Sequence, residues 1–204
     1  MNQVVFVVIL FCFGNVAAYP SGAASSACES MTPNHGASAQ PNNESPYNVT
    51  ISSSAYTYES EIQIQISSDV NFKGFLLQVR NPDTDEIYGE FIENPPSTKY
   101  LGCTGGTSNA VTHSDSTNKM FLEFTWKANF QNGPSTLVPY VTVVQSRLTF
   151  WVKLEGPEIN SCNLNCLNGG TCSFNGNGEE ICNCDDGFSG PTCKIITVYC
   201  PCKN

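Results

Sequence analysis

The sequence predicts an all-β protein in which an antiparallel β-sandwich precedes a small disulfide-rich module. Beyond residue 46, apolar and polar residues alternate in short runs, which is typical of half-buried strands. Turn-forming combinations of Asn, Pro, Asp and Gly separate these runs, and no segment keeps helical spacing. Near the C-terminus, six cysteines fall within the 32 residues from Cys162 to Cys193. The alternating runs predict the sandwich, and the clustered cysteines predict the module.

The chain begins with a segment typical of a secretory signal peptide. An apolar run extends from Val4 to Phe13, which is too short to span a bilayer but suits the core of a signal peptide. Val16 and Ala18 occupy positions minus three and minus one of a cleavage site, so we expect residues 1–18 to be removed. No second apolar run approaches spanning length, so we expect no membrane span and a secreted, extracellular protein.

The segment from Tyr19 to Pro46 is rich in Ser, Ala, Asn, Pro and Gly, which predicts an extended arm. Cys28 lies in the middle of this arm. Cys103 is the only other cysteine between the signal peptide and the clustered cysteines. A Cys28–Cys103 disulfide is therefore the natural pairing, and it would tie the arm to the sandwich.

Alternating runs predict the strands of the sandwich in chain order. The clearest is Ile62, Ile64 and Ile66, which alternate with glutamines. Periodicity does not decide which residue of the Phe150–Trp151 pair points inward. The remaining runs are Phe75 to Arg80, Met120 to Trp126 (with Met120, Leu122, Phe124 and Trp126 in alternation), Tyr140 to Val144 and Leu148 to Leu154.

Six short pieces of this region, taken together and in order, resemble the reeler domain. They are Tyr19–Ala23, His35–Gly36, Ser45–Tyr47, Phe72–Arg80, Thr112–Ser114 and Phe124–Trp126. Reeler domains begin reelin and spondin-type matrix proteins and occur in secreted insect defence proteins. The resemblance implies an immunoglobulin-like antiparallel β-sandwich over residues 19–159. One departure is Asn129, where many members of the family carry a proline, and it leaves the local turn open but not the fold.

The six clustered cysteines resemble an EGF-like domain in their spacing, in the Asn168-to-Cys172 stretch and in the closing stretch from Gly187 to Cys193. A segment this short buries too little apolar surface to fold without cross-links. The alternative for clustered cysteines is a zinc site, but the segment contains no histidine and no paired CxxC spacing. The resemblance implies an EGF-like domain over residues 160–194 with the disulfides Cys162–Cys172, Cys166–Cys182 and Cys184–Cys193.

No group of residues predicts catalysis, so we expect no enzyme activity, no cofactor and no metal site. His113, Ser114 and Asp115 are the residue types of a hydrolytic triad, but neighbours in an extended chain point to opposite faces. The acidic stretch 83–86 lacks the glycine and the distal glutamate of a calcium loop. Residues 159–161 also lack the acidic residues that calcium-binding EGF-like domains place before their first cysteine.

The formal net charge of −9 bears on the partners of the protein. Its nine Lys and Arg residues are scattered along the sequence and form no stripe, so nucleic acid is not an expected partner. The acidic balance also disfavours capture of anionic lipopolysaccharide by long-range attraction. Contacts to sugars or acyl chains would instead be aromatic or hydrogen-bonding.

Three residues are candidate glycosylation sites. Asn48 begins an Asn-Val-Thr sequon and should face water if Tyr47 and Val49 face the core. Thr171 matches the O-fucose pattern of EGF-like domains, and Ser189 matches their extracellular O-GlcNAc pattern. The alternative for both is that Thr and Ser suit exposed turns.

The tail, residues 195–204, carries two further cysteines, Cys200 and Cys202. A bond between them would close a very small ring around a proline and would be strained. We weigh two outcomes equally: the pair cross-links two copies into a disulfide-linked homodimer, or it pairs locally or with small molecules.

Two functions agree with these features. The protein is either an innate-immune pattern-recognition protein of antibacterial defence, with microbial surface glycans or lipids as partners, or an extracellular matrix or cell-adhesion protein that binds other extracellular proteins. The short length favours the first, because matrix proteins usually join many modules.

Overall fold

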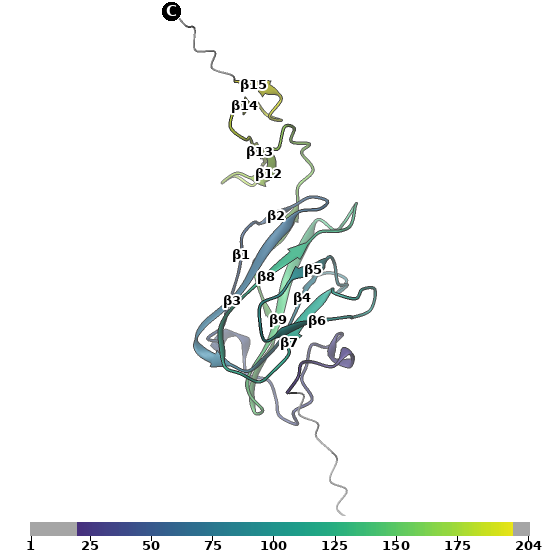
Figure 1. The fold of residues 1–204 in the computed structure, drawn as a ribbon, viewed down its shortest axis with the longest axis vertical. Helices are drawn as coiled ribbons and strands as arrows, with labels where there is room; N and C mark the ends of the chain where they lie inside the picture. The colour runs from purple at the N-terminus through teal and green to yellow at the C-terminus, as the bar shows by residue number, and fades with distance from the viewer. Residues whose placement is uncertain (1–19, 198–204) are drawn as a thin grey trace, which may run out of the picture.

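The computed structural model describes residues 20–197, and this part of the chain is all-β (Figure 1). Its helices are two single turns of 3-10 helix, η1 (Ser25–Ala27) and η2 (Asn42–Glu44). No helix of residues 20–197 has the length and apolar character to cross a membrane. The predicted signal peptide, residues 1–18, and both tail cysteines, Cys200 and Cys202, lie outside the described residues.

The sandwich consists of two sheets packed face to face. The smaller sheet has the strand order β1-β3-β8-β5, and its long β3–β8 pair is antiparallel, with Ile64 opposite Phe124. Its strands are β1 (Asn48–Ile51), β3 (Glu61–Phe72), β5 (Glu90–Glu93) and β8 (Lys119–Lys127).

The larger sheet has the order β2-β11-β9-β4-β7-β6, and β10 also pairs with β9. The strand β4 lies in its middle, antiparallel to both neighbours, with Leu76 opposite Thr142 of β9 and Thr112 of β7. The strands are β2 (Ala55–Tyr56), β4 (Gly74–Arg80), β6 (Thr98–Leu101), β7 (Ala110–His113), β9 (Thr136–Ser146), β10 (Thr149–Glu155) and β11 (Ile159–Ser161).

Large apolar side chains from both sheets fill the space between them. The isoleucines of β3 are buried, as their alternation predicts, and they pack with Phe124 and Trp126 of β8, which are fully buried. Each fully buried side chain of this size contributes about 1.5–3 kcal/mol through removal of apolar surface from water. The sandwich therefore has a core large enough to fold as an ordinary domain.

Two strands depart from simple alternation at their ends. In β8, Met120 is exposed, although it alternates with the buried Leu122, because the pairing of β3 and β8 shifts between Ser67 and Phe72. In β10, both Phe150 and Trp151 are buried. The register of β10 on β9 is irregular on either side of this pair, so the side chains no longer follow a period of two.

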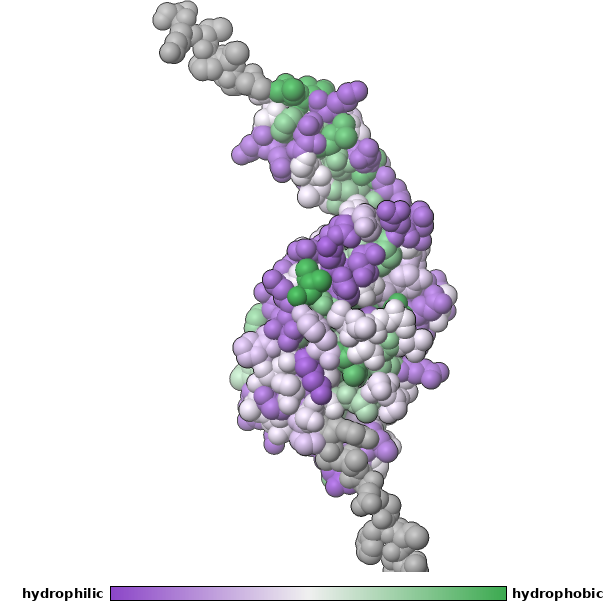
Figure 2. Space-filling view, turned by 45° about the vertical axis from the view of Figure 1, so that its right-hand side comes forward, coloured by the Kyte–Doolittle hydropathy of each residue, from purple (hydrophilic) through white to green (hydrophobic). Residues whose placement is uncertain are grey.

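A disulfide-rich C-terminal region follows the sandwich and extends away from it at the end opposite the N-terminal arm (Figure 1). It contains two small antiparallel sheets and three disulfides. Figure 2 shows apolar surface near the end of its described residues, where Ile195 and Ile196 are exposed. The strands are β12 (Thr171–Phe174), β13 (Glu180–Asn183), β14 (Phe188–Ser189) and β15 (Ile195–Ile196).

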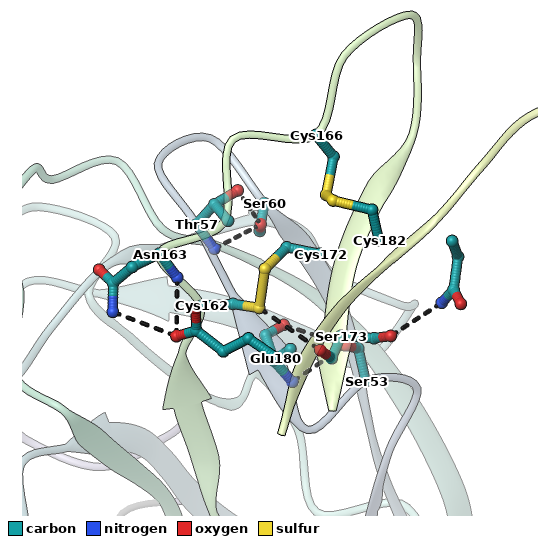
Figure 3. The surroundings of a disulfide bond; sticks show 12 residues. Ser53, Thr57, Ser60, Cys162, Asn163, Cys166, Cys172, Ser173, Glu180 and Cys182 are labelled. Carbon is teal, nitrogen blue, oxygen red and sulfur yellow. Dashed lines mark hydrogen bonds between the residues drawn. A yellow bond between two sulfur atoms is a disulfide. The ribbon is translucent and has the colours of Figure 1, made fainter. Parts of the chain in front are cut away.

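The strand β11 joins the two parts, and the domain boundary predicted at 159/160 falls inside it. Asn160 pairs with both β2 and β9, and its side chain accepts a hydrogen bond from Thr136 Oγ1 at 2.8 Å. The backbone N–H of Cys162 donates to the Tyr56 carbonyl at 2.8 Å. Cys162 is bonded to Cys172 of β12, so the first disulfide of the C-terminal region begins at the sandwich surface (Figure 3).

A candidate binding pocket under the N-terminal arm

The N-terminal arm covers the outer face of the larger sheet, and a disulfide and polar contacts hold it there. Cys28 is bonded to Cys103, with the two Cα atoms 5.7 Å apart and the two residues 75 positions apart in the sequence. This is the pairing that cysteine counting suggested. Both cysteines are buried together with Met31, Leu76 and Ala110, and this small cluster is separate from the main core. A long closed loop makes this disulfide an effective restraint on the unfolded chain.

Hydrogen bonds attach the arm at further points. The buried guanidinium of Arg80, on the outer face of β4, donates to the carbonyls of Cys28 and Glu29. Thr142 Oγ1 of β9 donates to the Met31 carbonyl at 2.7 Å, and the Ala23 N–H donates to Thr112 Oγ1 at 3.0 Å. The carbonyl groups of an irregular segment need such partners when they are buried.

A cavity of about 350 Å3 remains between the arm and the sheet. This volume lies in the range of small-molecule sites, which are mostly apolar with a few polar groups. Its floor is the outer surface of β4 and β9 and its roof is the arm. The apolar floor side chains are Leu76 and Val144, and the apolar roof residues are Pro20, Ala23, Ala24, Ala27, Met31 and Pro33.

Close backbone packing at one edge of the cavity depends on two glycines. Gly22 has a φ of +114°, and a Cβ there would lie 2.5 Å from the His113 carbonyl oxygen. A Cβ on Gly74 would lie 2.9 Å from the ring of the same histidine. Both glycines therefore allow the arm and β4 to approach His113 closely.

Four basic side chains line the cavity: Lys73, Arg147, His35 and His113. The two histidines are the only ones in the chain. His113 Nδ1 accepts a hydrogen bond from the Phe75 N–H at 3.2 Å, which holds its ring over the edge of β4. The Nδ1 of His35 is shielded from solvent and has no hydrogen-bond partner within residues 20–197.

The environment of His35 favours the neutral imidazole. Burial lowers the pKa of His35 from its usual 6.5 and outweighs a hydrogen bond with the Arg147 backbone, while the Arg147 charge lowers it further. The ring of His35 also meets the edge of Phe150, with centroids 5.5 Å apart. His35 thus contacts Phe150 and Arg147 at one side of the cavity.

The comparison with known families concerns the same part of the chain. A profile of the reeler domain matches residues 26–165. The chain belongs to the reeler family. The match includes the sandwich, the arm from residue 26 onward and all of β11.

Relatives of the reeler domain occur in proteins of different size. "Putative defense protein 3" of Antheraea mylitta is 35% identical over 145 residues, which cover 70% of this chain and 86% of that protein. Ferric-chelate reductase 1 of Homo sapiens is 29% identical over 159 residues, which cover 76% of this chain and 26% of that protein. The chain thus spans only about a quarter of the length of the ferric-chelate reductases that it matches.

The crystal structure of the human F-spondin reeler domain supports the fold. Its TM-score is 0.50 at 17% sequence identity, and the match covers 61% of this chain and 94% of that chain. At this identity the likeness concerns the β-sandwich alone. The immunoglobulin-like sandwich expected from the sequence is therefore the fold of the reeler domain.

The pieces of sequence that indicated the family converge on the cavity. Four of the six contribute lining residues, although up to about 90 residues separate them along the chain. The contributing pieces are Tyr19–Ala23, His35–Gly36, Phe72–Arg80 and Thr112–Ser114. The order of residues along the chain indicates these pieces but not the site that they form together. One feature of the sequence could have indicated that something covers the outer face of the sheet. The apolar residues of β4 occupy both of its faces, as in a strand that is covered on both sides.

The other predicted site residues lie away from this cavity. Asn48 and Thr171 are exposed, and Ser189 is half-buried. Whether any of the three carries a glycan stays a prediction. His113, Ser114 and Asp115 form no relay: Asp115 caps Thr117 and pairs with Lys119.

In the C-terminal region the structure joins Cys162 to Cys172, Cys166 to Cys182 and Cys184 to Cys193. One group of potential metal-binding atoms occurs within residues 20–197: the side chains of Cys162, Cys172 and Glu180, whose ligand atoms lie within 4.8 Å of one another. Glu180 instead accepts hydrogen bonds from Asn163 (Figure 3). The two sulfurs are bonded to each other and offer no thiolate to a metal.

Proposed function

We propose that this chain is a secreted recognition protein of innate immunity, and that its reeler domain binds microbial surface components in the cavity under the N-terminal arm. The observation that carries the proposal is the cavity itself, which is apolar inside and bordered by four basic side chains. Recognition sites of this kind need a mostly apolar pocket with a few polar groups that orient the ligand.

Two further observations support a defence role outside the cell. The defence protein of Antheraea mylitta matches over most of its length, whereas the ferric-chelate reductases match over a small part of theirs. Reductase activity is therefore not part of this proposal, and the chain is not proposed to be an enzyme. The four disulfides of residues 20–197 fit an oxidising, extracellular environment.

We also propose that residues 160–194 are an EGF-like domain. The support is the order of pairing, in which the first cysteine joins the third, the second joins the fourth and the fifth joins the sixth. This domain holds itself together by cross-links, and its position on the far side of the sandwich leaves the cavity open.

A homodimer linked through Cys200 and Cys202 would add avidity of roughly 10²–10⁴ over a single site if both copies engage one surface. Electrophoresis with and without reductant tests that dimer.

A second candidate function is adhesion to other extracellular proteins. It is favoured by the exposed Ile195 and Ile196, which form an apolar surface at the tip of the C-terminal region. Such a surface can contact a protein partner without use of the cavity. The two functions therefore depend on different ends of the molecule.

The test is capture of whole bacteria, purified peptidoglycan and purified lipopolysaccharide by the full chain, with matrix proteins as the comparison. The full chain is needed because a truncation at residue 159 would remove most of β11. Val144→Phe should fill the floor of the cavity and abolish capture. Val70→Phe is the matched control, since Val70 is exposed on β3 and does not line the cavity. Capture that survives Val144→Phe, or binding to matrix proteins alone, contradicts the proposal.

A further inference from the structure

The size of the cavity limits what it can hold. A water molecule in the liquid occupies about 30 Å3, and a methylene group is of similar size. A cavity of about 350 Å3 therefore has room for one acyl chain of on the order of ten methylenes. The lining matches such a chain, because alanine, proline, methionine, leucine and valine side chains form most of the roof and floor.

The charge at the cavity opposes the charge of the whole protein. The chain has 18 acidic and nine basic residues, yet the lining contains Lys73, Arg147 and both histidines and no Asp or Glu. The acidic residue next to the lining residue Ser116 is Asp115, whose carboxylate already pairs with Lys119 at 3.3 Å. Neither Lys73 nor Arg147 forms a salt bridge within residues 20–197. The lining of the cavity therefore includes two cationic residues without an acidic partner among residues 20–197.

One polar atom of the arm, at the side of the cavity near Arg147, lacks a partner. The Nδ1 of His35 is hidden from solvent and has no hydrogen-bond partner among the described residues. Buried polar atoms in native proteins are nearly always paired, so this one marks a place where the packing of the arm is incomplete. His35 lies on the arm near Arg147, and the two residues interact. Because Arg147 lines this side of the cavity and has no acidic partner within residues 20–197, we expect the anionic end of the ligand to lie here.

We propose that the cavity binds an amphiphile with a single acyl chain of about ten to twelve carbons and an anionic headgroup. The chain lies between the arm and the outer face of β4 and β9, and the headgroup lies at Lys73 and Arg147. This inference rests on the proposed function, because it names the ligand class of the same cavity. The acidic composition of the whole protein disfavours anionic ligands, but the tertiary structure provides a local cationic site for one.

Binding of dodecanoate to the full chain, measured by isothermal titration calorimetry below the micelle concentration, tests the chemistry. Dodecyltrimethylammonium has the same chain with the opposite charge and should bind far more weakly. Octanoate should bind on the order of a hundredfold more weakly than dodecanoate, because each buried methylene strengthens binding about fourfold. Equal affinity for the two dodecyl compounds, or for octanoate and dodecanoate, overturns the inference. Vesicles of phosphatidylglycerol tell whether the acyl chain must be free or can come from a membrane.

Variants locate the site. Val144→Phe should remove dodecanoate binding, and Ala24→Phe, which fills the cavity from the arm, is the second variant if the first disturbs the fold. Lys73→Gln/Arg147→Gln should weaken dodecanoate binding about tenfold, since each exposed ion pair contributes a factor of a few. Lys194→Gln is the charge control, because Lys194 lies in the C-terminal region, and it should leave the affinity unchanged. Folded cavity variants that retain wild-type affinity overturn the inference.

The outcomes separate this inference from the proposed function. Capture of bacteria without dodecanoate binding overturns the ligand class alone. Dodecanoate binding without capture of bacteria or their purified surface components overturns the microbial function alone and leaves the ligand class supported.

Discussion

The inner face of β4 is buried by large side chains, whereas its outer face is buried by a segment of chain. On the inner face, Phe75 and Leu77 pack among the rings and isoleucines of the opposite sheet. On the outer face, Arg80 and Thr142 bind carbonyls of an arm that is rich in small residues. Close packing leaves no room for a ligand. A segment held at a few points can leave space, and the cavity lies under the arm.

The largest loss of stability is expected from a substitution in the core that packs against the inner face of β4. Phe124→Ala should lower the free energy of unfolding by about 3–5 kcal/mol, because a large buried ring leaves a cavity that the core only partly fills. Phe124 is fully buried and contacts the ring of Phe75, with centroids 5.4 Å apart. Urea unfolding measures the change. Phe121→Ala on the same strand is the control, since Phe121 is 57% exposed, and it should cost no more than about 0.5 kcal/mol. Similar losses for both would contradict the buried packing of Phe124.

The next effect concerns the arm. Removal of the Cys28–Cys103 bond by Cys28→Ser/Cys103→Ser should cost about 2–4 kcal/mol, as is typical of a disulfide that closes a long loop. Hydrogen exchange should show where stability is lost. The Ala23 amide, which donates to Thr112, should exchange faster, while the amide of Ile64 in β3 should follow only global unfolding. Unchanged exchange at Ala23 would show that the polar contacts hold the arm without the disulfide.

The smallest effect is an acid dependence at Asp85, in the turn that follows β4. Asp85 pairs with the buried Arg80 at 2.7 Å and with Lys153 at 2.9 Å. Burial alone would raise the pKa of Asp85, but hydrogen bonds from Lys153 and Arg80 outweigh it, so its pKa lies below the usual 3.8. A lowered folded-state pKa stabilises the protein at neutral pH, and this contribution disappears as pH falls below about 4.

Asp85→Asn should therefore reduce stability at pH 7 and flatten its dependence on pH below about 4. The loss should be at most about 1 kcal/mol, because Asp85 is half exposed and solvent screens the pair. Thermal unfolding across pH 2.5–7 measures both. Asp83→Asn, an exposed change in the same turn, is the control and should leave the neutral-pH stability unchanged. Identical acid profiles for Asp85→Asn and the parent chain would contradict the role of this ion pair.

Local pattern predicted most of the sandwich, because alternation depends on neighbouring residues in one strand. Ile62 to Ile66 and Phe75 to Arg80 form strands where the sequence predicted them. Alternation was misleading where register shifts: Met120 is exposed, and Phe150 and Trp151 are both buried. A bulge depends on the partner strand, so the sequence of one strand does not reveal it.

The sequence by itself determined the all-β class, the family and a Cys28–Cys103 pairing, since each depends on residue order, spacing or cysteine count. Only the tertiary structure decided the binding site. Lys73 and Arg147 are 74 positions apart in the sequence, and a scattered set of basic residues predicted no cationic site. They lie at one cavity because β4 and β9 pair and the arm folds back over both. Charge acts through distance in space, and that distance is set by strand pairing and not by sequence order.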